Sequence, residues 1–418
     1  MAQLLPFRGV RPLDELAERI IAPPYDVLSE DEARSLTRSN PRSFLHVTRP
    51  EVSLPLGSDP HGPQAYAVAR SNLGRFLEQG WLIQDDGPCF YLYGQTWKGR
   101  SQVGLMAICS VDEYDQGRIK RHELTRPDKE QDRVDHISAL GTQTGLVFLA
   151  YRDQPEVQAA LDQAARLPPT WSVVTEDQVE HSLTVVADQN LVEAIQLAFT
   201  HVPALYIADG HHRSAAASRV RERLGGSGSS SWFLAGVYPD VQLEVLAYNR
   251  IVRDLNGHSP EELLQAISSR FEVTHDTDPV PSRRGCFTMY IQGRWSRLSV
   301  PEADLPDDPV ASLDVALLQD RLLEPLLGIE NPRTDQRIGF VGGIRGHQAL
   351  EDAVNRGDAA IAFHMFPTGM DQLFAVADAD LLMPPKSTWF EPKLRGGVVM
   401  HRFTGDSPGD QDNPASLS

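Results

Sequence analysis

The segment Ala204–Ala217, ALYIADGHHRSAAA, joins an apolar stretch to an alanine-rich one. The residues with chemistry between them are Asp209, Gly210, His211, His212 and Arg213. A strand that runs directly into a helix points the free N–H groups and the positive dipole end of that helix at whatever lies above the strand. Cations in the first turn oppose the dipole, so they are tolerated more readily when an anion is bound there. We therefore expect a phosphate site, held by backbone N–H groups and the Arg213 guanidinium.

Within this segment, Gly210 allows the backbone to approach a ligand closely, and Asp209 could cap the helix or hold a magnesium ion. Two plainer interpretations stay open. Asp209 could be only an N-cap, with both histidines on the surface. His211 and His212 could instead bind a metal, although adjacent residues diverge by about 100° around a helix.

A second cluster of charged residues occupies Arg121–Arg133, RHELTRPDKEQDR. Its charged types are His122, Glu123, Arg126, Asp128, Lys129, Asp132 and Arg133. Because Thr125 and Pro127 make the run a poor helix, we expect a loop that supplies a carboxylate and cations to a phosphate site. The alternative is an ordinary solvated face.

The segment Met383–Val399, MPPKSTWFEPKLRGGVV, combines cations, hydroxyls and aromatic rings. Lys386, Ser387 and Thr388 place a cation and two hydroxyls on a short stretch, and Lys393 follows the Trp389-Phe390 pair. An aromatic residue beside cations could stack a base and contact phosphates. The alternative is a buried Trp-Phe pair that closes the C-terminal core.

The rigid turn Ala22–Asp26, APPYD, presents a carboxylate. A positioned Asp26 near a phosphate donor could take the proton of an attacking hydroxyl. A turn-forming role for Asp26 explains the sequence equally well.

The composition limits the classes of partner. The 418 residues carry a formal net charge of −18, which repels a polyanion such as DNA unless a local basic patch overrides it. Three cysteines in the whole chain fit a reducing cytosol rather than a disulfide scaffold. The start lacks a long apolar stretch, and the most apolar windows are strand-length, so we expect no membrane partner and a cytoplasmic protein. Walker A, G-x-G-x-x-G, H-E-x-x-H and C-x-x-C motifs are absent.

The periodicity predicts a mixture of helices and strands. Helices are expected at Leu13–Ile20, Ser29–Ser39, Gln64–Gln79, Gln189–Phe199, Asp209–Leu224 and Val310–Leu323. Strands are expected at Ser43–Val47, Phe90–Thr96, Val103–Val111, Gly145–Ala150, Leu183–Val186, Ala204–Ala208, Trp232–Tyr238 and Leu243–Tyr248. This alternation indicates an α+β or mixed α/β fold rather than a doubly wound sheet. We divide the chain into an N-terminal α+β part, residues 1–256, a C-terminal α+β part, residues 257–403, and a disordered tail, residues 404–418.

Four blocks in order carry a resemblance to a known family: APPYDVLS, the HE-x-T with the following K and D-R, ADGHHR, and MPPKSTWFEPK. Together they resemble the family of unknown function numbered 1015, from Leu5 to about Phe403. The DGHHR block is also similar to the phosphate-binding motif of free-serine kinases of the ParB/sulfiredoxin-like class, which phosphorylate L-serine with ADP or ATP. That resemblance implies a ParB/sulfiredoxin-like nucleotide-binding core in residues 1–256, with nucleotide-phosphate contacts from residues 209–213. It assigns no catalytic carboxylate.

We therefore expect a kinase that transfers a phosphoryl group from ATP or ADP, with Mg²⁺, to a small hydroxylated metabolite, free serine being the first guess. The candidate catalytic residues are Asp26, Glu123, His211 and Arg213. Further phosphate contacts are expected from Lys129, Arg133, Lys386, Ser387, Thr388 and Lys393. The metal ligand is expected to be Asp209. A ParB-like nucleotide switch without kinase activity and a metal-dependent hydrolase using His122, Glu123, His211 and His212 remain as alternatives.

Overall fold

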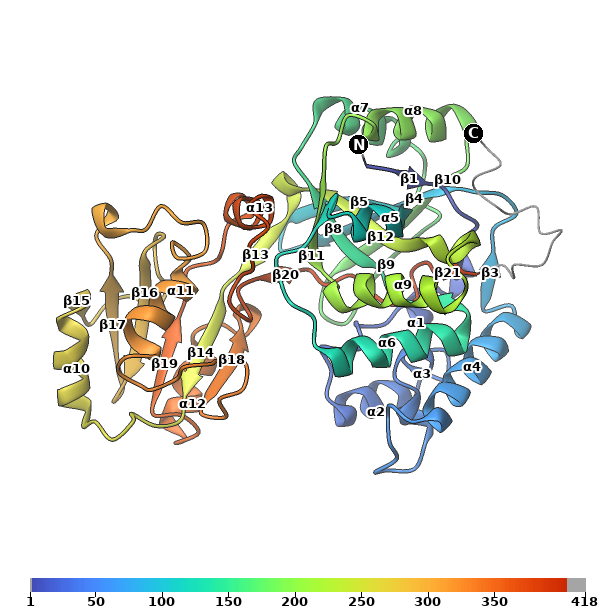
Figure 1. Ribbon diagram of the computed structural model, residues 1–418. Coiled ribbons are helices and arrows are strands. Elements are labelled where there is room, and N and C mark those ends of the chain that lie inside the picture. Colours follow the sequence, from blue (N-terminus) through green and yellow to red (C-terminus); the bar gives the residue numbers. More distant parts are fainter. Residues whose placement is uncertain (1, 404–418) are drawn as a thin grey trace. The chain divides into compact units, whose positions relative to one another are not determined.

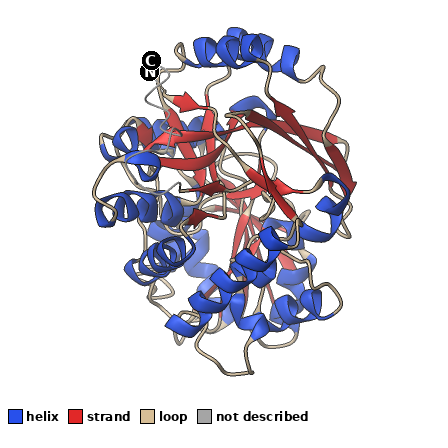
Figure 2. Ribbon diagram, turned by 90° about the vertical axis from the view of Figure 1, so that its right-hand side faces the viewer, coloured by secondary structure: helices blue, strands red, loops and turns tan. Residues whose placement is uncertain are grey.

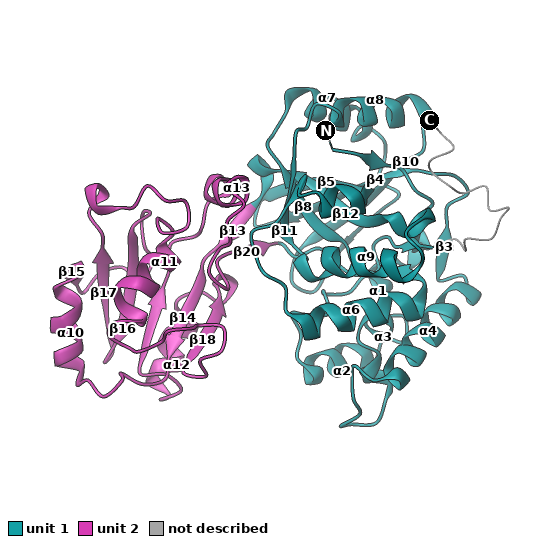
Figure 3. Cartoon of the chain, viewed as in Figure 1, with its two compact units in different colours: residues 1–243, 392–418 teal, residues 244–391 magenta. Residues whose placement is uncertain are grey.

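The computed structural model describes residues 2–403, and the predicted tail lies outside them. Two compact units make up the chain (Figure 3). Unit 1 contains residues 1–243 and 392–418, and unit 2 contains Glu244–Glu391. The division differs from the expected boundary at residue 256, because the chain returns to unit 1 after Glu391. Both units mix helices and strands, so the chain has the predicted α+β character (Figure 2).

Unit 1 is built on a mixed nine-stranded sheet with the order β6-β11-β8-β12-β5-β4-β10-β9, and β1 pairs with β5 beside this path. Its strands are β1 (Leu4–Leu5), β4 (Phe90–Trp97), β5 (Arg100–Ser110), β6 (Ile119–Lys120), β8 (Val147–Tyr151), β9 (Trp171–Val174), β10 (Glu180–Val186), β11 (Leu205–Asp209) and β12 (Trp232–Pro239). Two small sheets pair β2 (Val10–Pro12) with β3 (Leu82–Gln84), and β7 (Thr142–Gln143) with β21 (His401–Arg402).

The helices of unit 1 cover both sides of this sheet. They are α1 (Ala17–Ile20), α2 (Glu30–Arg38), α3 (Leu45–Thr48), α4 (Pro63–Glu78), α5 (Val111–Asp115), α6 (Pro127–Leu140), α7 (Pro155–Ala164), α8 (Gln189–Phe199) and α9 (His211–Arg223). Helices α7 and α8 lie on one side of the sheet, and α9 and α6 lie side by side on the other (Figure 1).

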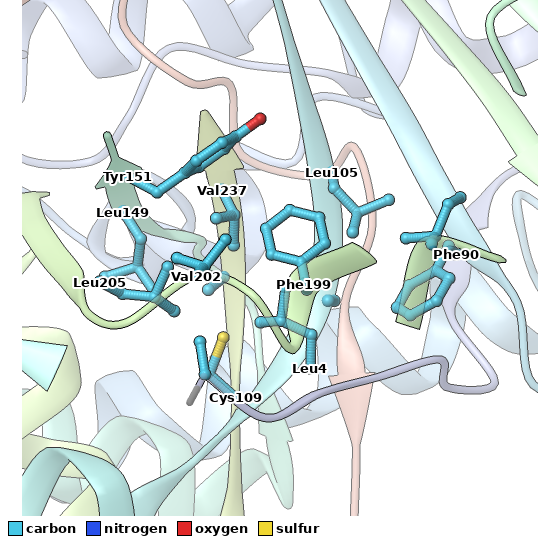
Figure 4. Close-up of a cluster of buried hydrophobic side chains, with 14 of the residues drawn as sticks. Leu4, Phe90, Leu105, Cys109, Leu149, Tyr151, Phe199, Val202, Leu205 and Val237 are labelled. Atoms are coloured by element: carbon cyan, nitrogen blue, oxygen red, sulfur yellow. The ribbon is translucent and has the colours of Figure 1, made fainter. Parts of the chain in front are cut away.

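The core of unit 1 forms between the sheet and helices α7 and α8. Figure 4 shows part of this cluster, in which Tyr151 of β8 packs on Phe199 of α8 with ring centroids 5.3 Å apart. Both side chains are nearly or fully inaccessible to solvent. Since strand β8 contributes five consecutive buried residues, it reads in the sequence as a continuous apolar run.

Several expected elements are present with shifted ends. The expected helix at Gln189–Phe199 coincides with α8. The helix expected at Ser29–Ser39 is α2, and Ser29 is its N-cap: the Ser29 hydroxyl accepts from the Glu32 amide, and the Glu32 carboxylate accepts from the Ser29 amide. The strands expected at Phe90–Thr96 and Val103–Val111 correspond to β4 and β5, which pair as a hairpin.

Two local predictions were wrong. Ser43–Val47 was expected to be a strand, but residues 45–48 form helix α3, which packs on α4 with Phe44 against Phe76 at 6.5 Å between centroids. A five-residue apolar run does not distinguish strand from helix, so tertiary packing decided. Residues 121–133 were expected to be a loop, but Pro127 starts helix α6. Proline is favoured at the first helical position, where its missing N–H costs nothing.

Unit 2 is built on a six-stranded sheet with the order β15-β17-β16-β19-β14-β18. These strands are β14 (Tyr248–Val252), β15 (Glu272–His275), β16 (Cys286–Ile291), β17 (Arg294–Ser299), β18 (Ile338–Gly342) and β19 (Ile361–His364). A separate pair joins β13 (Glu244–Leu246) to β20 (Trp389–Glu391). The helices are α10 (Pro260–Ser268), α11 (Asp314–Leu318), α12 (Gln348–Asn355) and α13 (Met370–Asp378).

Two expectations for unit 2 also need correction. The long helix expected at Val310–Leu323 is the short helix α11 followed by a π-helical turn, Gln319–Leu323. The strand expected at Leu243–Tyr248 is divided between β13 and β14. None of the helices between residues 2 and 403 combines the length and the apolar character that crossing a bilayer requires.

Asp314, at the start of α11, is a buried carboxyl group in unit 2. It is 5% exposed, and its Oδ1 has no hydrogen-bond partner among the described residues. Burial raises the pKa of Asp314 to about 7, against the opposing effect of hydrogen bonds from the Gly285 and Cys286 amides and of the Arg284 charge. The protonated carboxyl is therefore favoured in the folded protein over most of the acidic range.

We expect the pKa of Asp314 to make unit 2 less stable as the pH rises. The folded pKa lies above the unfolded value, so the contribution is fully present below about pH 4 and is lost as the pH rises through about 7. The change is at most about 4 kcal/mol. Urea unfolding of the full chain at several pH values measures it. Asp314→Asn should flatten the dependence over this range, and an unchanged slope in the variant would refute the assignment.

Packing around strand β5 generates a second prediction. A methyl group at Gly104 would overlap the buried ring of Tyr238. Gly104→Ala should therefore lower the free energy of unfolding by about 1–3 kcal/mol through overpacking. Gly74, inside α4, meets nothing within 4 Å at its Cβ position, so Gly74→Ala should raise the free energy of unfolding by about 0.5–1 kcal/mol. Urea unfolding measures both variants. The same change in the free energy of unfolding for Gly104→Ala and Gly74→Ala would contradict the packing described for β5.

Candidate functional site

The turn between β11 and α9 depends on Gly210. Its φ of +98° lies in the left-handed region, and a Cβ there would lie 3.4 Å from the Val147 Cα atom. The Gly210 carbonyl then accepts from the amides of Arg213 and Ser214, which begins the helix. The predicted order of strand, glycine and helix is confirmed, and glycine is favoured there because the backbone adopts a positive φ.

Asp209 and Lys393, which the sequence placed in separate candidate blocks, form an ion pair. The Lys393 Nζ lies 2.8 Å from the Asp209 Oδ2. Burial alone would raise the pKa of Asp209, but Lys393 and then Arg213 lower it well below its usual range. Asp209 is therefore an ionised carboxylate beside a cation.

His211 and His122 form a buried pair of imidazoles. Their ring centroids are 4.6 Å apart in an edge-on arrangement. Burial lowers the pKa of His122 to about 4 and the pKa of His211 well below its usual range. His211 is therefore uncharged in this structure, and it contributes no cation to the start of α9. One nitrogen of each ring, His122 Nδ1 and His211 Nε2, has no hydrogen-bond partner among the described residues.

His212 and Arg213 take different directions from the same helical turn. The His212 Nε2 accepts from the Arg126 amide at 3.0 Å. The Arg213 Nη1 donates to the Leu146 carbonyl at 2.5 Å, and its Nη2 lies 3.5 Å from the Asp26 Oδ2. The Arg213 Nε is buried without a hydrogen-bond partner between residues 2 and 403.

Arg213 and Arg133 both lie against the ring of Tyr25. Their guanidinium carbons are 5.5 Å and 4.0 Å from the ring centroid. Asp132 accepts from the Arg133 guanidinium, and Asp26 is the acidic partner of Arg213. The APPYD turn and helix α6, far apart in the sequence, therefore meet α9 at this point.

These arginines line a cavity of about 650 Å³, a volume that includes its part open to solvent. A third arginine, Arg395, lines it as well. The lining residues are Pro23, Pro24, Tyr25, Thr48, Arg133, His136, Ile137, Gln143, Thr144, Gly145, Leu146, Val147, Arg213, Phe233, Leu234, Leu394, Arg395 and Gly396. Three guanidinium groups on an otherwise mostly apolar wall favour an anionic ligand with an apolar body.

Several predicted residues lie elsewhere. Lys129 is exposed on the first turn of α6, and Glu123 is half-buried in the segment before α6; neither lines the cavity. Lys386, Ser387 and Thr388 belong to unit 2. There the Lys386 ammonium lies 5.6 Å from the centroid of the Tyr248 ring, and the Ser387 hydroxyl donates to the Pro384 carbonyl at 2.7 Å. A catalytic role of Glu123 and a role of the other four residues in phosphate binding stay predictions.

Sequence reasoning did not select Arg395, Tyr25 or the segment Gln143–Leu146 as site residues. Arg395 lies only two residues after Lys393, within the segment Met383–Val399 that the sequence singled out. The segment Gln143–Leu146 carries one signal, a glycine two residues before the buried strand β8; a Cβ on Gly145 would lie 3.5 Å from the Arg213 Nε, which is an ordinary contact distance.

The side chains described in residues 2–403 include no group of three or more His, Cys, Asp or Glu residues placed to hold a metal ion. His122, Glu123, His211 and His212 therefore do not form a transition-metal site in this arrangement. For Mg²⁺, Asp209 supplies one ionised oxygen ligand, which Lys393 already neutralises. Since Mg²⁺ is commonly bound by one or two carboxylates together with substrate phosphates and water, one such ligand fits.

The Asp209–Lys393 pair generates a prediction. Removing Lys393 leaves the partly buried Asp209 carboxylate without its nearest cation, so Lys393→Met should lower the free energy of unfolding by about 1–2 kcal/mol. Asp209→Asn combined with Lys393→Met should cost less than Lys393→Met alone, because no uncompensated charge remains. Urea unfolding measures both, and a double variant less stable than the single one would contradict the pairing.

The chain is also similar to several solved structures. A mutant of a free serine kinase in complex with AMP matches with a TM-score of 0.34 and 13% identity, over 69% of this chain and 86% of that one. A conserved hypothetical protein from Pyrococcus furiosus matches with a TM-score of 0.33 and 11% identity, over 69% and 90%. A C-terminally truncated SbnI from Staphylococcus aureus matches with a TM-score of 0.33 and 14% identity, over 69% and 84%.

No curated protein matches the sequence. The model of one family, described as protein of unknown function (DUF1015), matches residues 4–316, about three quarters of the chain. Three of the four blocks that carry the resemblance lie within this range, and the fourth, MPPKSTWFEPK, lies beyond it. The chain belongs to the DUF1015 family of proteins of unknown function.

Proposed function

We propose that unit 1 binds the phosphates of a nucleotide in the cavity lined by Arg133, Arg213 and Arg395. The nucleotide is ATP or ADP, and its terminal phosphoryl group passes to a hydroxyl of a small metabolite, with free serine as the first candidate. The nucleotide-binding core in this proposal is of the ParB/sulfiredoxin-like type, and the protein acts in the cytoplasm on a small molecule rather than on nucleic acid or a membrane.

One observation carries this proposal: three arginine residues line a single cavity. Like charges at close range repel, so such a cluster is tolerated when anions compensate it. One guanidinium group can donate two parallel hydrogen bonds to the oxygens of a phosphate, and it stays charged at any physiological pH.

The acidic partner of Arg213 leaves room for a ligand. Asp26, the partner of Arg213, has a side chain 43% exposed, and the two groups are 3.5 Å apart. An incoming phosphate can therefore replace Asp26 at little cost. A displaced Asp26 carboxylate stays beside the ligand, where it can accept the proton of an attacking hydroxyl. Glu123 is the second candidate base.

Arg213 is the central residue of the proposed mechanism. It stabilises the negative charge on the transferred phosphoryl group, because its position is fixed by the Leu146 carbonyl and by the start of α9. Mg²⁺ would supply further charge neutralisation between the phosphates and Asp209. Lys393 holds Asp209 ionised. His212 accepts a hydrogen bond from the amide of Arg126, the residue before α6, and so holds the start of α6 against α9.

A nucleotide switch without phosphoryl transfer would use the same cavity, and only a transfer assay distinguishes it from a kinase. A hydrolase built on His122, Glu123, His211 and His212 lacks the donor arrangement it needs among the described residues. The net charge of −18 argues against a nucleic-acid ligand for either function.

We expect Arg213→Ala to abolish phosphoryl transfer while the protein stays folded. Loss of one electrostatic donor of this kind typically lowers the rate by about 10²–10³. Phosphate-transfer assays with ATP or ADP and candidate hydroxylated metabolites measure the effect, and circular dichroism checks the fold. Arg166, an exposed arginine of unit 1, provides the matched control, because Arg166→Ala removes the same charge away from the cavity.

A thermal-shift screen with ATP, ADP, CTP and magnesium identifies the nucleotide first. Binding at 100 times Kd adds about 2.7 kcal/mol to the stability, which is readily detected. Wild-type nucleotide binding in Arg213→Ala would refute the assignment of this residue.

A further inference from the structure

Arg395 is almost fully buried, and its guanidinium is held on one side only. It is 8% exposed and lines the cavity. Its Nε donates to the His181 Nε2 at 3.3 Å, and its Nη2 donates to the Thr175 hydroxyl at 3.3 Å and to the Asp177 carboxylate. Its Nη1 has no hydrogen-bond partner among residues 2–403. This nitrogen is therefore the part of the guanidinium that remains available to a ligand.

The hydrogen bond to Arg395 fixes the state of His181. A guanidinium only donates, so the His181 Nε2 must carry the lone pair. Burial and then the Arg395 charge lower the pKa of His181 to about 3, which keeps the ring neutral. The single ring proton is then on Nδ1, and Nδ1–H donates to the Tyr93 hydroxyl oxygen at 2.8 Å.

Tyr93 completes the support from the other side. Its ring stacks on His181 with centroids 5.9 Å apart and an interplanar angle of 12°. Its hydroxyl oxygen also accepts from the Arg395 amide at 3.4 Å. Both rings are completely buried on neighbouring strands β4 and β10. Tyr93 and His181 therefore hold both the backbone and the side chain of Arg395.

We propose that Arg395 is a third anion-binding residue of the cavity, and that His181 and Tyr93 are positioning residues that aim its guanidinium at the ligand. This inference rests on the proposed function. It adds Arg395 as a ligand contact, and His181 and Tyr93 as the residues that position it. The counterion of Arg395 is Asp177, whose side chain is 55% exposed. Water can therefore solvate the Asp177 carboxylate when a ligand anion compensates the charge of Arg395.

The arrangement explains why a neutral histidine accompanies a buried arginine. An acidic residue in place of His181 would neutralise Arg395 and weaken its attraction for a ligand anion. A protonated histidine there would repel it. An uncharged acceptor orients the guanidinium without adding to the neutralisation that Asp177 already supplies.

Titration calorimetry of the full chain with inorganic pyrophosphate tests the proposal. Arg395→Ala should weaken binding about tenfold or more, as expected for the loss of a charge-assisted hydrogen bond. His181→Leu should weaken binding by a smaller factor, and His181→Gln should restore most of it, because a glutamine carbonyl can accept from the Arg395 Nε. Arg166→Ala should bind as the wild type does.

A double variant separates positioning from general destabilisation. If His181 acts through Arg395, then His181→Leu should cost nothing further in an Arg395→Ala background. An equal cost in both backgrounds would overturn its role as a positioning residue. Wild-type affinity in a folded Arg395→Ala protein, together with weakened binding in Arg213→Ala, would overturn this inference alone. Absence of pyrophosphate binding in the wild type, or wild-type affinity in Arg213→Ala, would overturn the proposed function as well.

Discussion

The candidate site depends on one electrostatic constraint: positive charges that come from distant parts of the chain face the same cavity. Arg133 comes from α6, Arg213 from α9 and Arg395 from the segment that returns to unit 1 after β20. Each guanidinium is held by hydrogen bonds that it donates to the protein, to a carboxylate, a carbonyl or a neutral ring. The repulsion between them is offset by partial neutralisation from carboxylates whose exposure differs widely.

Burial, rather than sequence neighbourhood, sets the charge state of the histidines. His211 and His122 face each other inside unit 1, where loss of water lowers both pKa values. His181 is neutral for the same reason, with the charge of Arg395 adding to the effect. A histidine beside an arginine in the sequence therefore does not add a positive charge to the site. The cationic character of the cavity comes from the arginines.

Some local features could be predicted because they need only neighbouring residues. The Ser29 cap needs a hydroxyl and Glu32 three residues later, and the turn at Gly210 needs a residue that adopts positive φ between a strand and a helix. The errors arose where packing decides. Residues 45–48 are helical because Phe44 packs on α4, and Pro127 begins a helix whose buried face carries Arg133. The pattern of charges alone did not show that this face turns inward.

The sequence by itself determined the α+β class, the strand–glycine–helix turn and the set of residue types from which a phosphate site can be built, because these follow from short-range periodicity, backbone freedom and side-chain chemistry. Only the tertiary structure decided which of those residues meet. It paired Asp209 with Lys393, turned His211 inward, and brought Arg395 to the cavity on the support of Tyr93 and His181. Contacts between residues up to about three hundred positions apart are set by the pairing of strands and the packing of helices, which no local pattern encodes.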